Sequence, residues 1–114
     1  GTPPMNVLPL SKDGIQIGFR PEKVVLTYKP YKGTYQRKGV IVTREMLGSE
    51  TLYKVDLGHE SVMVKSVDET FRRGEQVYVS VQAEDLCFFD RNGLRMRDVK
   101  GDDFGQYLAA GGTN

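Results

Sequence analysis

The sequence lacks several features that point to particular classes of protein. It contains one cysteine, Cys87, and no tryptophan among 114 residues. An internal disulfide and a cysteine-based metal cage are therefore excluded, and a single thiol leads us to expect a cytosolic protein. No apolar run is long enough to cross a membrane, and the N-terminus has no charged-then-apolar signal pattern.

An excess of charge of either sign is also lacking. Sixteen Lys and Arg face fifteen Asp and Glu, which gives a formal net charge of +1. This balance excludes a strongly basic nucleic-acid binder and gives no membrane-surface signal. The composition, 39% hydrophobic and 27% charged, is that of one globular domain of ordinary size. Composition alone names no function.

The residues that are abundant favour strands. There are thirteen valines and only three alanines, a balance typical of β-structure. In Gln76–Gln82, valines alternate with polar or amphipathic residues for seven positions, which is the period of a strand. We expect each such run to turn a valine-rich face to a core. The other runs contain Tyr53, Val55 and Leu57, then Val62 and Val64, and an earlier pair, Val40 and Val42.

Turn residues separate these runs. Gly58-His59 and Asn92-Gly93 predict tight hairpin connections. Short helical turns are expected near Pro21–Lys23 and Ala83–Asp85, and residues 101–114, with four glycines and no strand pattern, are expected to be mobile. The prediction is an all-β fold, a small barrel or sandwich of short antiparallel strands with a flexible C-terminal tail.

No residue pattern predicts catalysis. The only histidine, His59, lies in a predicted turn without a partner or a pocket. Cys87 lies in an apolar strand, where we expect a small buried hydrophobe. Neither phosphate-binding glycine motif is present. We expect this chain to be no enzyme, with no catalytic residue, no metal ligand and no cofactor of its own.

Charge is unevenly distributed along the chain. Seven basic residues and one acid lie between Arg20 and Arg44, and three tyrosines are interleaved with them. Basic and aromatic side chains together suit single-stranded nucleic acid, although they also occur on ordinary exposed loops. Residues 45–69 carry six acids against two bases, and such a charge axis suits self-association. The alternative nucleic-acid site would consist of Tyr28, Lys29, Tyr31, Lys32, Tyr35, Arg37 and Lys38.

One loop offers a second kind of site. In Leu47–Thr51 a glycine is followed by hydroxyl and carboxylate side chains. Such a loop can present backbone N–H groups and short polar side chains to an anion or a partner. The spacing alone favours a simple strand connection or a bulge, in which Ser49 and Thr51 bond their own backbone.

Four segments carry a family resemblance. They read GTPPMN at 1–6, IGFRPE at 17–22, LGSET at 47–51 and QAEDLCFFD at 82–90, followed by Gly93. In this order they resemble the C-terminal regulatory region of ATPase subunits from sugar-importing ABC transporters of the maltose and glycerol-phosphate type. That region is called a TOBE domain and uses the OB-like barrel also found in molybdate-binding domains. The resemblance covers about residues 1–97.

The resemblance implies a piece of a larger ATPase subunit. An upstream domain would bind ATP and Mg²⁺, and this chain would be a non-catalytic regulatory and dimerisation domain that pairs with a second copy. The ATPase would act with membrane permease subunits at the inner face of the membrane, and a regulatory protein or small ligand would dock on the barrel. The implied domains are a linker and short leading segment at 1–14, a barrel at 15–100 and a tail at 101–114. The implied ligand or partner residues are Arg20, Glu22, Gly48, Ser49, Glu50 and Thr51.

The chain departs from the family pattern in one place. Family members usually have more sequence between the Met-Asn junction and the Arg-Pro-Glu segment, whereas here only residues 7–19 intervene. We expect Met5–Leu10 and Ile15–Ile17 to replace the first strands, or a partner copy to complete a trimmed barrel. A small-oxyanion sensor and a free-standing nucleic-acid binder remain the alternative functions.

Overall fold

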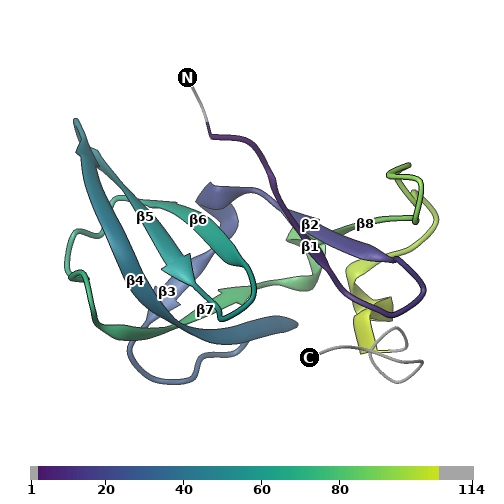
Figure 1. The fold of residues 1–114 in the computed structure, drawn as a ribbon, viewed down its shortest axis with the longest axis horizontal. Coiled ribbons are helices and arrows are strands. Elements are labelled where there is room, and N and C mark those ends of the chain that lie inside the picture. The colour runs from purple at the N-terminus through teal and green to yellow at the C-terminus, as the bar shows by residue number, and fades with distance from the viewer. Residues whose placement is uncertain (1–2, 106–114) are drawn as a thin grey trace.

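The computed structural model describes residues 3–105, which form two antiparallel sheets (Figure 1). The strands are β1 (Asn6–Pro9), β2 (Gln16–Phe19), β3 (Val25–Thr27), β4 (Tyr35–Leu47), β5 (Glu50–Asp56), β6 (Ser61–Ser66), β7 (Gln76–Val81) and β8 (Cys87–Phe89). Three short 3₁₀ helices are η1 (Pro21–Lys23), η2 (Ala83–Asp85) and η3 (Gly101–Asp103). The predicted all-β class is confirmed.

The larger sheet is organised around β4. Its strand order is β3-β7-β4-β5-β6, and the smaller sheet has the order β1-β2-β8. The first half of β4 pairs with β7 and the second half with β5, with a register shift between Ile41 and Thr43. A bulge of this kind bends a strand and increases its twist. One long strand therefore links the body of the sheet to a projecting hairpin.

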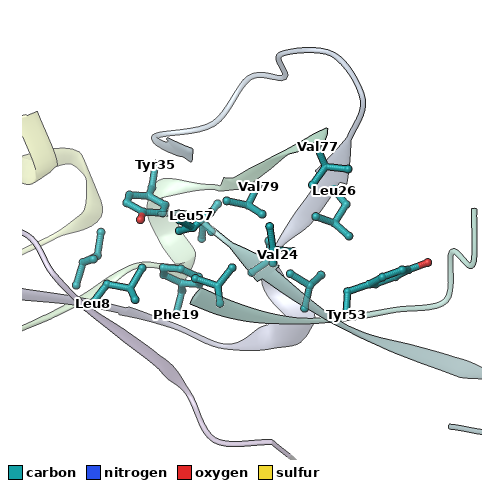
Figure 2. Packing of buried hydrophobic residues seen from close by; sticks show 14 of the residues in the cluster. Leu8, Phe19, Val24, Leu26, Tyr35, Tyr53, Leu57, Val77 and Val79 are labelled. Atoms are coloured by element: carbon teal, nitrogen blue, oxygen red, sulfur yellow. The ribbon is translucent and has the colours of Figure 1, made fainter. Parts of the chain in front are cut away.

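The valine-rich runs form the core, as the sequence predicts. Val77, Val79 and Val81 are fully buried, and the side chains of β5 and β6 that share their face are buried with them. Figure 2 shows Val77 and Val79 lying close to Leu26 and Val24 inside this packing. Period-2 alternation thus places one face of each strand against the other sheet.

In β4 the prediction of which face is buried is wrong. Val40 is 39% exposed, while its neighbour Ile41 is buried. The inner face carries Tyr35, Gly39 and Ile41 instead. A Cβ at Gly39 would lie 2.7 Å from the Asp56 backbone oxygen, so the glycine is required by the close approach of β5. Val40 points outward because Gly39 and Ile41 hold the inward positions on either side of it.

The predicted turns are present. Pro21–Lys23 and Ala83–Asp85 are η1 and η2, and Gly58-His59 lies in the loop that joins β5 to β6. The Asn92-Gly93 turn returns the chain so that Phe89 bridges Arg95. Both strands expected near the N-terminus, β1 and β2, form and pair with each other.

The end of the described chain folds back on the barrel. Gly101 is buried and belongs to η3, so the segment expected to be a tail from residue 101 begins as ordered structure. A Cβ at Gly101 would lie 1.8 Å from the Ala83 backbone oxygen, because η3 packs directly on η2. Residues 106–114 lie outside the described part of the chain. Within residues 3–105, no helix has both the length and the apolar character needed to span a membrane.

Candidate functional site

The β4–β5 hairpin projects from the sheet. Beyond Val40, β4 leaves β7 and pairs only with β5, as far as the pair Leu47 and Glu50. Gly48 and Ser49 form the turn, and Gly48 has a φ of +68°, a conformation that glycine adopts without strain. We call residues 43–54 the β4–β5 arm; its tip lies at the upper left of Figure 1.

The end of the arm is apolar and exposed. Met46 is 47% exposed and Leu47 is 42% exposed, and Val67, just beyond the paired end of β6, is 78% exposed. Glu45, on the same strand, is exposed beside them. Exposed apolar side chains at the end of a projecting hairpin can contact another protein on either face of the hairpin.

The predicted residues of the 47–51 segment divide into two groups. Gly48 and Ser49 are exposed at the turn. Glu50 forms an ion pair with Lys65 at 3.3 Å on the arm's flank. Thr51 is buried, and its hydroxyl donates to the Met46 sulfur at 3.2 Å. Thr51 therefore fixes the arm from inside and faces no ligand, which corrects its assignment as a binding residue.

Arg20 and Glu22 lie in a different place. Arg20 precedes η1 and Glu22 belongs to it, both exposed, while Pro21 is buried between them. Arg20 lines a cavity of about 210 Å³ whose walls include no residue of the 47–51 segment. Its other walls are Met5, Lys23, Glu84, Asp85, Leu86, Cys87 and Arg95. The structure thus brings the first, second and fourth resembling segments together and leaves the third on the arm.

The alternative nucleic-acid site is disrupted by burial. Tyr35 is only 4% exposed and packs against Phe19 and Phe104, with ring centroids 5.3 and 5.8 Å away. Burial raises the pKa of Tyr35 above its ordinary value, a shift opposed by neighbouring Arg37. A ring in the core cannot stack on a base, so the assignment of Tyr35 is wrong.

Arg37 is likewise committed within the fold. Its guanidinium pairs with Glu60 at 3.0 Å and donates to the Leu57 backbone oxygen at 3.2 Å. These bonds join the first half of β4 to the β5–β6 loop. The side chain was expected to contact nucleic acid, but here its donors hold the β5–β6 loop against β4.

The remaining members of that set are exposed. The Tyr28 hydroxyl donates to Glu75 at 2.6 Å, which raises the pKa of Tyr28 and lowers that of Glu75. Its ring lies 4.9 Å from that of Phe71. Lys38 lies 6.0 Å from the centre of the Tyr78 ring. Tyr31 is 49% exposed, and Lys29 and Lys32 are exposed near it.

The structure adds a basic surface that sequence reasoning missed. A cavity of about 430 Å³ lies between η2 and residues 95–102, which we call the strap. Arg95, Arg97 and Lys100 line it. Their close spacing in the sequence was an available signal, but nothing in the sequence predicted that the strap folds back to face Arg20. Among residues 3–105, no group of three or more His, Cys, Asp or Glu could hold a metal ion.

A comparison with protein families decides the relationship. Residues 17–89, well over half of the chain, match the family described as TOBE domain. The chain belongs to the TOBE domain family. The match begins inside β2 and ends with β8, so it includes both sheets of this TOBE domain except β1.

Among solved structures, this TOBE domain is similar to one described as the cytoplasmic molybdate-binding protein ModG, with molybdate bound. The TM-score is 0.59 at 12% sequence identity, over 70% of this chain and 61% of that one. This likeness supports the OB-like fold. No curated protein sequence matches the chain.

Proposed function

We propose that this TOBE domain is a non-catalytic regulatory and dimerisation domain of the ATPase subunit of an ABC-type sugar importer. Membership of the TOBE family supports a regulatory or ligand-binding role. The segments that resemble maltose and glycerol-phosphate importers support the finer assignment. The observation that carries the dimerisation part is the exposed apolar tip of the β4–β5 arm, Met46 and Leu47.

Contact with a partner would stabilise the β4–β5 arm. Two large apolar side chains nearly half exposed on a hairpin tip lose contact with water when a second surface covers them. Glu45 and Ser49 would remain at the rim of such a contact, as polar residues do in protein interfaces. A second copy provides the same patch and allows a symmetric contact.

The proposal extends to the rest of the transporter. An upstream domain of the same polypeptide would bind ATP and Mg²⁺, and permease subunits would contact that domain. Pairing of two TOBE domains would keep the ATPase dimer together while the nucleotide-binding domains separate. The protein would act in the cytoplasm, at the inner face of the membrane. This chain would contribute no catalytic group.

Sedimentation velocity of the 114-residue chain tests dimerisation. We expect a concentration-dependent shift from monomer to dimer, which Leu47→Glu weakens at least about tenfold by placing a charge in the contact. Val7→Glu is the matched control, because Val7 is also exposed, at 44%, but lies on the edge strand of the smaller sheet. A strict monomer at high concentration, or equal weakening by both variants, contradicts the proposal.

An immunoblot of source-cell lysate tests the transporter assignment. An antibody raised against this domain should detect a band several times the 12.8 kDa mass of this chain, partly recovered with membranes. A soluble band at the mass of this chain would instead indicate an independent binding module.

Oxyanion sensing is the second candidate function. The observation that favours it is the fold shared with ModG, which is described as binding molybdate. Calorimetric titration with molybdate, sulfate and phosphate tests it. The candidate is abandoned if none of the three produces heat of binding.

A further inference from the structure

A basic groove lies where the strap folds back beside η1 and η2. Its two cavities, of about 430 and 210 Å³, share Glu84, Leu86 and Arg95 in their walls and so adjoin. Together, the two adjoining cavities have a volume typical of sites for small molecules. We call the two cavities together the strap groove.

Within the described residues, the cations of the strap groove form no ion pair. The smaller cavity has Arg20, Lys23 and Arg95, and the larger has Arg95, Arg97 and Lys100, so that Arg95 belongs to both sets. The ion pairs within residues 3–105 are Arg37 with Glu60 and Lys65 with Glu50, and neither involves the groove. Five cations facing three carboxylates leave an excess of positive charge that an anion would neutralise.

The wall formed by the strap is held in place. The Met96 backbone N–H donates to the Phe88 oxygen at 2.8 Å, which ties the strap to β8. Val99 and Phe104 pack against the core, and Gly101 lies directly on Ala83. A wall fixed before the ligand arrives lowers the entropic cost of binding.

The groove also contains groups that suit the organic part of a ligand. Leu86 and Val99 provide apolar surface, and Glu84 and Asp102 provide acceptors for hydroxyl groups. Arginine donates two parallel hydrogen bonds to phosphate oxygens, and lysine binds phosphate as a point charge. Two sets of three cations, joined by Arg95, match a ligand with more than one phosphate group.

We propose that the strap groove binds a small molecule with two or more phosphate groups, held by Arg20, Lys23, Arg95, Arg97 and Lys100. This site is separate from the arm and does not depend on dimerisation or on the transporter assignment. A free inorganic polyphosphate and a phosphorylated sugar share the chemistry that these cations recognise.

Calorimetric titration of the 114-residue chain tests the site with three ligands: orthophosphate, inorganic tripolyphosphate and fructose 1,6-bisphosphate. We expect tripolyphosphate or the sugar bisphosphate to bind at least about tenfold more tightly than orthophosphate, because both cation sets are engaged. Arg95→Gln should weaken that binding about tenfold or more, since each lost charge-assisted bond is worth that factor. Arg73→Gln, an exposed arginine in the loop before β7, is the matched control and should change binding less than twofold.

The outcomes separate the two ligand sources. Tighter binding of the sugar bisphosphate than of tripolyphosphate assigns the site to phosphorylated sugars; the reverse order assigns it to inorganic polyphosphate. The absence of binding for both, or equal weakening by Arg95→Gln and Arg73→Gln, overturns the proposal. Circular dichroism of each variant confirms that it remains folded, and Lys100→Gln provides a second groove variant should Arg95→Gln unfold.

Discussion

At the scale of single residues, one glycine determines how the chain closes over the strap groove. A Cβ at Gly101 would lie 1.8 Å from the Ala83 backbone oxygen and 2.5 Å from the carbonyl carbon. These are backbone atoms, which cannot rotate away as a long side chain does. No other residue type fits between η3 and η2 in this arrangement.

Gly101→Ala should therefore destabilise the domain by about 1–3 kcal/mol, because η3 must move away from η2. Gly105→Ala is the control, since a Cβ there would contact nothing within 4 Å. Urea unfolding measures both free energies. If Gly101→Ala unfolds at the same midpoint as Gly105→Ala, the packing of η3 on η2 is wrong.

Because of Tyr35, we expect the free energy of unfolding to fall at alkaline pH. Burial, opposed in part by Arg37, raises its pKa above the ordinary 10.0. The folded state then holds the hydroxyl proton more tightly than the unfolded state, so this contribution is complete below pH 10.0 and is lost as pH rises through the folded-state pKa.

Tyr35→Phe should consequently flatten the dependence of the unfolding free energy on pH above 10.0. Tyr31→Phe changes an exposed ring in the same way and should keep the wild-type profile. Denaturation series at several alkaline pH values compare the variants. Parallel profiles for wild type and Tyr35→Phe would show that the buried hydroxyl is not the source.

At the scale of elements, a side chain substitutes for a strand. β6 is an edge of the larger sheet, and its outward backbone groups at Met63 are bonded by Asn6. The Asn6 amide donates to the Met63 oxygen at 2.9 Å and accepts from the Met63 N–H at 2.8 Å. The start of β1 thereby ties the smaller sheet to the larger one and covers part of an open edge.

Asn6→Ala should lower the unfolding free energy by about 1–3 kcal/mol, because two partly buried backbone groups lose their partner. Asn92→Ala is the control, because Asn92 lies in an exposed turn and its side chain makes no hydrogen bond to residues 3–105. Urea unfolding decides between them, and amide exchange at Met63 should quicken in Asn6→Ala alone. An unchanged exchange rate would contradict the role of Asn6 at the edge.

The same scale shows what the sequence could and could not predict. Alternation correctly placed Val77, Val79 and Val81 inside, because β7 is a central strand with one face covered by the core. In β4 it failed, since Gly39 holds an inward position that hydrophobicity does not reveal. The Asn6 contact spans 57 positions in the chain and depends on hydrogen-bond geometry, so no local pattern could predict it.

At the scale of the whole molecule, the candidate site residues lie in two separate places. The sequence grouped Arg20 and Glu22 with residues 48–51, but the structure places Arg20 in the strap groove and Gly48 at the arm's tip. No pattern in the sequence showed that Arg95 and Arg20 line one cavity. That arrangement depends on tertiary folding, which brings residues 20 and 95 to the same cavity.

The tip of the arm and the strap lie at opposite ends of the molecule (Figure 1), so substitutions in the two should be energetically independent. Effects of distant substitutions without shared partners are additive within a few tenths of a kcal/mol. Leu47→Glu should weaken self-association and leave the affinity for tripolyphosphate within twofold of wild type, whereas Arg95→Gln should do the reverse. The double variant Leu47→Glu with Arg95→Gln, examined by sedimentation and calorimetry, should show the two single effects unchanged. Coupling of more than about 1 kcal/mol between them would mean that ligand binding at the strap is transmitted to the arm through the shared strand β4 and the core.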